Sequence, residues 1–201
     1  METFEAIYAR RAVKHFDPNF EIPADDLNRI LDAAIQAPTS FNIQHWRFVL
    51  AKDPELRRQI RALGNDQAQM TDASVLIIMT ADLHAWKKSP ERYWKNAPKQ
   101  VADLLVGWMG PFHEGREWLQ RDEAQRSIGM AMQTIMLSAK SLGYDSCPMI
   151  GFEIEKVAQL INLPADHVMG PMIAIGKATK DTWPKPGQLP LEEVVIENRF
   201  R

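Results

Sequence analysis

The sequence predicts a mixed fold of α-helices and β-strands in which helix predominates. Ala24–Ala37 carries apolar residues at helical spacing, and Glu117–Leu142 is the longest helix candidate. Ser74–Thr80 is instead a continuous apolar run, as expected of a strand buried on both faces. The 201 residues are 45% apolar, which is enough to form a core, and they contain no repeat or low-complexity tract.

The predicted helices carry local start and stop signals. Pro23 precedes Ala24–Ala37, acidic residues fill its first turn, and Pro38 ends it. Gly64 and Gly143 stop two other helices, because glycine readily adopts the left-handed conformation that follows a last helical turn. The predicted helices are Thr3–Arg11, Ala24–Ala37, Pro54–Leu63, Pro98–Trp108, Glu117–Leu142 and Glu153–Leu163.

The predicted strands are Trp46–Ala51, Ser74–Thr80 and Val168–Gly176. They are too few and too far apart in the chain to suggest a parallel series of strand–helix–strand units. Residues Gly143–Gly151 are predicted to form a loop after the long helix. Trp183–Arg201 contains three prolines and is predicted to be an extended tail.

Composition excludes several classes of partner. The chain has 24 basic and 26 acidic residues, so it lacks the positive charge that nucleic acids or anionic membranes attract. Cys147 is the single cysteine, which rules out an intrachain disulfide and a thiolate zinc site. Residues 1–11 do not resemble a signal peptide, and no apolar run is long enough to span a bilayer. We therefore expect a cytoplasmic protein with no nucleic-acid or membrane partner.

Several catalytic signatures are absent from the sequence. No G-x-G-x-x-G follows a predicted strand, and the P-loop, H-E-x-x-H and G-x-S-x-G motifs do not occur. The histidines show no metal-ligand spacing; they are His15, His45, His84, His113 and His167. These absences disfavour a separate dinucleotide-binding crossover, zinc chemistry and hydrolases of the nucleophile-elbow type.

Three segments have compositions suited to ligand binding, and each also has a simpler interpretation. Arg10–Lys14 holds three cations, which could bind a phosphate or merely complement a helix C-terminus. Ala37–Trp46 holds short polar side chains, which could contact a heteroatom-rich ring or cap a turn. Gly143–Gly151 could offer backbone N–H groups to a ligand or serve as a connector between helices.

Together these segments resemble the FMN-dependent nitroreductase family. Residues 10–16 read R-R-A-V-K-H-F and are similar to the family's R-R-S-V-R-x-F opening. Residues 37–46 read A-P-T-S-F-N-I-Q-H-W and are similar to A-P-S-S-x-N-x-Q-P-W. The remaining matches follow in the same order along the chain, at Asp72–Ser74, Leu142–Gly151, Ile175–Lys177 and Leu189–Val195.

The resemblance implies an α+β sandwich with a central, mainly antiparallel sheet flanked by helices. Residues 1–201 would form one FMN-binding domain of an intertwined homodimer, with Glu117–Leu142 at the dimer core. Residues 177–201 would be a tail that wraps the partner and adds to its sheet. The implied activity is an NAD(P)H-dependent flavin oxidoreductase. Hydride would pass from NADPH or NADH through flavin N5 to electron-poor small molecules such as nitroaromatics or quinones, in a ping-pong reaction.

The resemblance also assigns the residues that contact FMN. Arg10 and Arg11 would contact the phosphate or ribityl chain, and Lys185 in the tail would reach the phosphate. Lys14 would lie near the pyrimidine end of the ring and support the negative charge of the reduced flavin. No side chain is expected to act as a nucleophile or general base, because the chemistry belongs to flavin N5.

The other implied contacts come from three short segments. The segment contributed by the other subunit comprises Pro38, Thr39, Ser40 and Asn42. Gln67 and Gln69 would face the carbonyl edge of the ring. Backbone N–H groups of the loop at Met149, Ile150 and Gly151 would meet flavin N5.

The chain departs from the family pattern at several positions. Ala12 replaces a serine, His45 replaces the proline before the tryptophan, and Ile150 stands where some members carry glutamate. Gly187 or Gln188 stands where an arginine often follows the tail lysine. Loss of that cation weakens FMN binding by roughly 1–3 kcal/mol unless another group compensates.

Residues 84–118 are rich in aromatic side chains: Trp86, Tyr93, Trp94, Trp108, Phe112 and Trp118. In the family this stretch borders the acceptor site, where such rings would stack on flat acceptors; the alternative is core or interface packing. The resemblance leaves other flavin reactions open, including enone reduction, reductive dehalogenation and heterocycle oxidation. A flavin-binding carrier or sensor with negligible turnover and a structural dimer without flavin are further alternatives.

Overall fold

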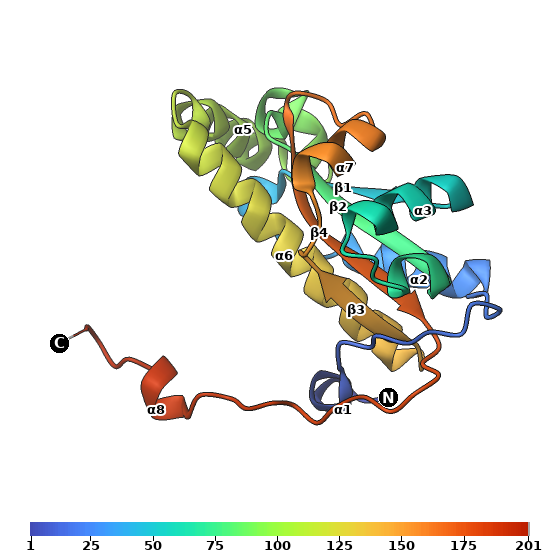
Figure 1. The fold of residues 1–201 in the computed structure, drawn as a ribbon. Coiled ribbons are helices and arrows are strands. Elements are labelled where there is room, and N and C mark those ends of the chain that lie inside the picture. Colours follow the sequence, from blue (N-terminus) through green and yellow to red (C-terminus); the bar gives the residue numbers. More distant parts are fainter. Residues whose placement is uncertain (201) are drawn as a thin grey trace.

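The computed structural model describes residues 1–200 and places helices around one β-sheet (Figure 1). The helices are α1 (Thr3–Ala9), α2 (Ala24–Ala34), α3 (Pro54–Leu63), α4 (Gln69–Asp72), α5 (Lys99–His113), α6 (Glu117–Ser141), α7 (Ile154–Leu160) and α8 (Leu191–Val194). The strands are β1 (Trp46–Leu50), β2 (Val75–Asp82), β3 (Asp145–Met149) and β4 (His167–Gly176). Short 3₁₀ helices lie at η1 (Ser40–Asn42), η2 (Ala85–Lys87) and η3 (Pro90–Trp94). Within residues 1–200, no helix is long and apolar enough to cross a membrane.

The four strands have the order β1-β2-β4-β3, and every neighbouring pair is antiparallel. This arrangement confirms the predicted α+β class with a central antiparallel sheet. The central strands β2 and β4 are the two apolar runs of the sequence, and both are buried along most of their length. A continuous apolar run therefore marked a strand covered on both faces, as predicted.

The edge strand β3 was not predicted, because its residues were assigned to a loop. Its sequence, Asp-Ser-Cys-Pro-Met, lacks the β-branched and aromatic residues that favour strands. Pro148 lacks an N–H group, yet it is tolerated because β4 is the only strand beside β3 among the described residues, which leaves Pro148 at an edge of the sheet. The interpretation of Gly143–Gly151 as a connector between helices is therefore wrong.

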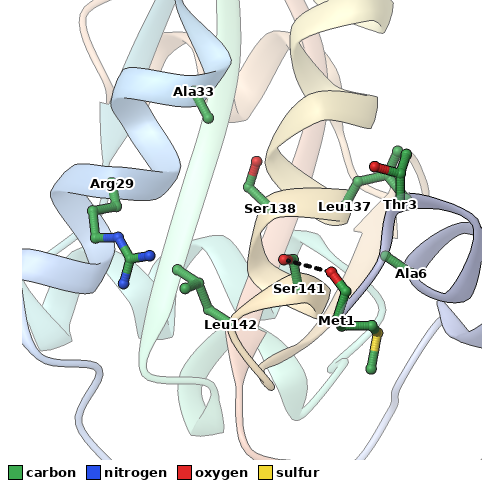
Figure 2. A pocket seen from close by; sticks show the side chains of 9 residues that line it. All are labelled: Met1, Thr3, Ala6, Arg29, Ala33, Leu137, Ser138, Ser141 and Leu142. Atoms are coloured by element: carbon green, nitrogen blue, oxygen red, sulfur yellow. Dashed lines mark hydrogen bonds between the residues drawn. The ribbon is translucent and has the colours of Figure 1, made fainter.

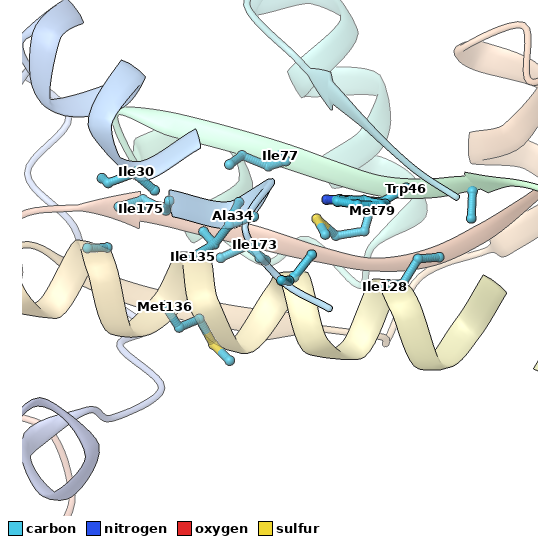
Figure 3. Packing of buried hydrophobic residues seen from close by; sticks show 14 of the residues in the cluster. Ile30, Ala34, Trp46, Ile77, Met79, Ile128, Ile135, Met136, Ile173 and Ile175 are labelled. Carbon is cyan, nitrogen blue, oxygen red and sulfur yellow. The ribbon is translucent and has the colours of Figure 1, made fainter. Parts of the chain in front are cut away.

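Helices α2 and α6 cover one face of the sheet (Figure 3). Ile30 of α2 and Ile135 of α6 are fully buried against Ile77 and Ile173 from the central strands. Close packing of α6 also requires Gly170 in β4, where a Cβ atom would lie 2.8 Å from Ile128 Cγ2. The long helix predicted from the sequence is thus anchored along the sheet by large apolar side chains.

Helices α3, α4 and α7 cover the opposite face of the sheet. Alternate residues of the central strands point to this side, including Leu76, Ile78 and Met172. They meet Ile60 of α3 and Val157 of α7, all fully buried. The result is a three-layer sandwich, which confirms the layer arrangement implied by the resemblance.

A third, smaller apolar cluster lies beneath residues 84–113 and is called the satellite core here. Its buried members are Ile43, Ala85 and Met109, and its partly buried members are Phe41, Trp86, Tyr93 and Trp94. Helix α5 extends to His113, five residues past the predicted end at Trp108, and includes Pro111. Proline disfavours a helix interior, yet the helix continues past Pro111, with Met109 and His113 buried on either side of it.

Helix ends and the tail account for the remaining differences. Helix α1 ends at Ala9 rather than Arg11, and α2 ends at Ala34, before the predicted end at Ala37. After β4 the tail is extended as predicted, apart from the single turn of α8. It runs away from the body of the molecule in Figure 1. The last residue of the predicted tail, Arg201, lies outside the described residues.

Candidate active site

The segment that follows α1 forms the first part of the candidate site. The backbone N–H of Val13 donates to the carbonyl of Ser146 in β3, so the segment runs along the outer edge of the sheet. Val13 and Phe16 are buried, whereas Lys14 and His15 are exposed. Pairing at this edge therefore leaves the Lys14 side chain accessible to solvent.

A cavity of about 510 Å³ lies between this segment and the start of the tail. Arg11, Lys14 and His15 line one side, and Lys180 and Trp183 belong to the tail side. Arg11, Lys14 and Lys180 are cationic at neutral pH, against the single carboxylate of Asp181 in the lining. The net positive charge suits the cavity to an anionic group such as a phosphate.

Further cations gather at the C-terminal end of α1. Arg11 Nη1 donates to the carbonyl of Tyr8 at 2.6 Å, and Lys185 Nζ donates to the carbonyl of Ile7 at 3.5 Å. The structure therefore brings the predicted tail lysine to the predicted arginine segment, although they are more than 170 residues apart in sequence. Within residues 1–200, the hydrogen-bond acceptors of Arg11 and Lys185 are backbone carbonyls and not carboxylates, so the positive charge of this surface is not neutralised by an ion pair.

Lys14 and Gln69 form a polar floor around the thiol of Cys147. Gln69 Nε2 lies 3.9 Å from Cys147 Sγ and 2.9 Å from Gln67 Oε1. Burial raises the pKa of the Cys147 thiol, while Lys14, Gln69 and Arg10 act in the opposite direction. The cationic segment and the two predicted glutamines therefore meet at β3, on one side of the sheet.

The loop after β3 supplies backbone groups beside this floor. Asn65 Nδ2 and Gln67 Nε2 donate to the carbonyl of Gly151 at 3.3 and 3.1 Å, which fixes the orientation of the loop. Within residues 1–200, the N–H groups of Ile150 and Gly151 have no hydrogen-bond acceptor. Met149 is buried in the core, so only its backbone can face a ligand. The loop thus presents free N–H donors next to the amides.

The second predicted segment, Pro38–Asn42, lies elsewhere in the same chain. Asn42 Nδ2 donates to the carbonyl of Tyr93 at 2.8 Å, and Thr39 Oγ1 accepts from the N–H of Gln44 at 3.0 Å. Ser40 Oγ is buried and has no partner among the described residues. Such an orphaned hydroxyl is uncommon in proteins and is consistent with a missing ligand or neighbouring chain.

Within one chain, the two halves of the predicted site stay apart. The cationic segment, the glutamines and the Gly151 loop surround β3. Pro38, by contrast, lies against Gly129 and Met130 in the middle of α6. A site that uses both halves requires a second subunit.

Two supporting residues were missed by the sequence analysis. Asn65 helps to hold the Gly151 carbonyl, and Cys147 lies beneath Lys14. Asn65 follows a glycine at the end of α3 and adopts a positive φ of 55°, so its side chain turns back toward the sheet. Its position directly after the glycine that ends a helix indicates a turn residue. No local pattern in the sequence predicts the contact between Asn65 and Gly151.

The aromatic residues of 84–118 divide into packed and exposed groups. Trp86 stacks on His113, and Trp94 Nε1 donates to the carbonyl of Phe41 at 3.1 Å. Trp108 and Trp118 are more than half exposed. Packing therefore explains the first group, whereas the exposed rings are free to meet another molecule.

A separate cavity of about 320 Å³ lies between α1, α2 and α6 (Figure 2). Arg29 is its single charged side chain, and Ser141 Oγ donates to the carbonyl of Met1 across it at 3.5 Å. The remaining lining is small or apolar, including Ala33, Leu137 and Leu142 in Figure 2. This cavity lacks the convergent polar groups of a catalytic site.

Sequence comparison agrees with the geometry around β3. The profile described as "Nitroreductase family" matches residues 7–177, which include the cationic segment, the glutamines and the Gly151 loop.

The chain belongs to the nitroreductase family.

Among curated relatives, it is 58% identical to Protein DrgA of Synechocystis over 97% of this chain and 95% of that protein. Among solved structures, it resembles a proposed NAD(P)H:FMN oxidoreductase from Staphylococcus epidermidis, with 28% identity and a TM-score of 0.90 over 97% of this chain and 95% of that chain. It also resembles a proposed nitroreductase from Exiguobacterium sibiricum solved in complex with FMN, with 25% identity and a TM-score of 0.89 over 98% and 97% of the two chains.

Proposed function

We propose that this nitroreductase-family protein is an FMN-dependent NAD(P)H oxidoreductase that reduces electron-poor small molecules such as nitroaromatics or quinones. The observation that carries the proposal is the meeting, at β3, of a cationic cavity, a lysine–glutamine floor and a loop with free N–H groups. When bound, FMN supplies the redox chemistry by accepting hydride from NADH or NADPH and passing electrons to the acceptor. The donor and the acceptor would use the same site in turn.

The residues around β3 fit the separate parts of FMN. Arg10, Arg11 and Lys185 would hold the phosphate by charge-assisted hydrogen bonds. Lys180 lines the same cavity as Arg11, so it can replace the cation that the tail lacks after Lys185. An anion bound there would replace the contacts of Arg11 and Lys185 with α1 carbonyls by charge-assisted hydrogen bonds to phosphate oxygens.

The remaining groups would orient the ring. Gln67 and Gln69, whose amide nitrogens donate here to the carbonyl of Gly151 and to Gln67 Oε1, would turn toward the ring carbonyls. The N–H groups of Ile150 and Gly151 would donate to flavin N5. Lys14 would stabilise negative charge on the reduced ring, because a nearby cation lowers the energy of an anion in a partly buried site. These residues bind and orient, and none has to act as a nucleophile.

We propose that the protein is a homodimer built on α6. Residues 127–139 contain no charged side chain, although the exposed face of α6 includes Gly129, Met130 and Gln133. A hollow of about 610 Å³ on this face is lined by these residues together with Pro38 and Arg126. A long uncharged helix face is unfavourable in water, and a second copy packed there would cover it. The Pro38–Asn42 loop would then lie at the interface, where it can reach the partner's flavin.

The tail fits the same assembly. Strand β1 is a sheet edge, and a groove of about 750 Å³ beside it is lined by apolar side chains such as Leu31, Phe48 and Leu50. The tail leaves Leu191 and Val195 more than half exposed in the isolated chain. We propose that residues 177–201 cross to the partner and pair with this edge, which would bury both surfaces. Residues 1–201 would then act as one FMN-binding domain.

The first experiment tests the flavin. The purified, desalted protein should show the two-band absorption of a flavin, which should bleach when NADPH or NADH is added without oxygen. A protein that stays colourless after incubation with FMN would contradict the proposal. A flavin that neither nucleotide bleaches would support the carrier or sensor alternative instead.

A variant pair tests the phosphate contacts. Arg10→Ala combined with Lys185→Ala should weaken FMN binding by about 10²–10⁴-fold, because each charge-assisted hydrogen bond contributes about 1.5–3 kcal/mol. Arg58→Ala is the control, since that arginine is exposed on α3. Circular dichroism should show an unchanged fold in all variants. Stoichiometric FMN in the double variant would contradict the assignment of the phosphate site.

Mixed dimers test whether the site is shared. Subunits with a bulky Ser40→Trp substitution, mixed with subunits that carry Arg10→Ala and Lys185→Ala, should form dimers with one intact site. Each parent dimer would have two damaged sites, so activity should reappear on mixing if the interface supplies Ser40. Absence of recovery in dimers verified by mass would argue against the shared site.

A further inference from the structure

Two buried histidines flank the loop Pro38–Gln44 and have no role in the contacts proposed above. His45 directly precedes β1, and His113 is the last residue of α5. Both imidazole side chains are 0% exposed. His45 directly follows the loop that carries Ser40 and Asn42, and the His113 ring contacts Phe41 within it.

The hydrogen bonds define which nitrogen carries the proton in each ring. His113 Nδ1 lies 2.8 Å from the carbonyl of Met109, which can only accept, so Nδ1 carries the proton. His45 Nδ1 lies 3.0 Å from Ser127 Oγ, whose own proton is donated to the carbonyl of Glu123. His45 Nδ1 must therefore donate to the hydroxyl. Both rings are neutral, and each Nε2 carries a buried lone pair without a partner among the described residues.

His113 holds the loop through its aromatic neighbours. Its ring stacks on Trp86 at 5.5 Å and 11°, and it meets the edge of Phe41 with ring centroids 5.9 Å apart. Phe112 contacts both rings, at 5.2 Å from Phe41 and 5.1 Å from His113. Phe41 is thereby held against the last turn of α5 by Phe112 and His113.

The loop depends on these contacts because its backbone is unfavourable. Phe41, Asn42 and Gln44 have φ values of 49°, 55° and 55°, in the left-handed region that side chains disfavour. His45 fastens the end of this strained stretch to α6 through Ser127. A loop in this conformation persists only while the surrounding contacts over-determine it.

We propose that His45 and His113, as neutral imidazoles, are positioning residues that hold Pro38–Gln44 in the shape that presents Ser40 and Asn42 to the flavin. The presentation to flavin rests on the proposed function; the holding of the loop does not. Acid would release the loop, because a protonated His45 would bury a charge and leave an N–H donor without an acceptor.

The groups around His45 determine whether its pKa lies above or below the ordinary value. Burial lowers the pKa of His45 to about 4, and His113 on α5 and Arg47 on β1 act in the same direction. Glu123 on α6 and Asp82 on β2 oppose them. Burial also lowers the pKa of His113, whereas the hydrogen bond to the Met109 carbonyl and the charge of Glu123 act to raise it. Both rings therefore stay neutral at pH 7 and resist protonation while the loop is in place.

Hydrogen–deuterium exchange of the full-length protein tests the proposal, with and without added FMN. If opening the loop returns His45 to its ordinary pKa, the opening equilibrium should increase about 30-fold between pH 7.5 and pH 5.0. After correction for intrinsic exchange rates, amides of residues 39–44 should show this increase, while those of β2 and β4 should not. The FMN dissociation constant should rise over the same pH range.

His45→Asn is the decisive variant, because its amide can donate to Ser127 from the position of Nδ1 but cannot titrate. It should keep the amide protection of residues 39–44 at pH 7.5 and lose most of the increase in exchange at pH 5.0. His84→Asn is the matched control and should behave like the unsubstituted protein. Exchange that is independent of pH in the unsubstituted protein, or an equal increase in His45→Asn, would overturn the proposal. Loop exchange that behaves as expected in a protein that binds no FMN would uphold the positioning role and refute only the flavin site.

Discussion

Arg57 offers a sensitive test of how the fold supports the candidate site. From α3, its Nε donates to the carbonyl of Met70 at 2.8 Å, and its Nη2 donates to the carbonyl of Ala73. These carbonyls belong to α4 and the turn into β2, next to Gln69. Burial lowers the pKa of the guanidinium, with Asp72 acting in the opposite direction, but an arginine stays charged at neutral pH.

Replacing Arg57 by methionine keeps an apolar stem of similar length and removes the donors. A hydrogen bond from a charged donor contributes about 1.5–3 kcal/mol to the free energy of unfolding. Because Arg57 is partly exposed, each of its hydrogen bonds contributes less than a fully buried one would. We expect a loss of about 2–4 kcal/mol in the free energy of unfolding, or roughly 5–15 °C in Tm for a chain of this size. FMN affinity should fall as well, because Gln69 loses its support.

Arg58→Met provides the matched control on the same helix. The Arg58 side chain is 67% exposed and pairs with Glu55 on the surface of the same helix, so its loss should cost at most about 0.5 kcal/mol. Thermal unfolding followed by circular dichroism, at one protein concentration and with saturating FMN, compares the two variants. Equal Tm values for Arg57→Met and Arg58→Met would refute the argument that buried carbonyls depend on this guanidinium.

Three other predictions follow from packing, charge and assembly. Gly170→Ala should destabilise the protein by about 1–3 kcal/mol in urea unfolding, because the new Cβ atom would lie 2.8 Å from Ile128; an unchanged midpoint would mean that α6 yields at little cost. Lys88 holds the pKa of Asp166 below its ordinary value, so this pairing stabilises the fold above about pH 4 and the contribution is lost as pH falls further. Lys88→Met should therefore flatten the acid side of the stability profile between pH 6 and pH 2.5, and an unaltered slope would argue against it. Deleting residues 188–201 should raise the dimer dissociation constant in analytical ultracentrifugation, whereas an unchanged constant would count against the crossing tail.

The sequence predicted those elements whose local pattern has a single physical explanation. The central strands were found because both are short, continuous apolar runs. A run of that length without polar residues is typical of a strand that is covered on both faces. Helix α3 was predicted with its observed bounds, since Pro54 starts it and Gly64 follows it. Strand β3 was missed because its residues lack strand preference, and its pairing with β4 provides what propensity does not.

The candidate site shows the same division. The order of short motifs along the chain was sufficient to suggest the family, which the comparisons confirm. The roles proposed for individual residues remain to be tested. Contacts such as Asn65 with Gly151, Arg57 with the α4 carbonyls and His45 with Ser127 join residues far apart in sequence. No local pattern encodes them, because each depends on where two distant backbones meet.

By itself, then, the sequence determined the fold class, the buried central strands and the family to which the chain belongs. Periodicity, composition and turn residues act over a few neighbours, so they can be read along the chain. Tertiary structure decided which segments meet, by covering β3 with the Arg10–Lys14 segment and by separating Pro38–Asn42 from it. It also decided that two histidines would be buried and neutral, because burial and desolvation arise only when distant elements pack together.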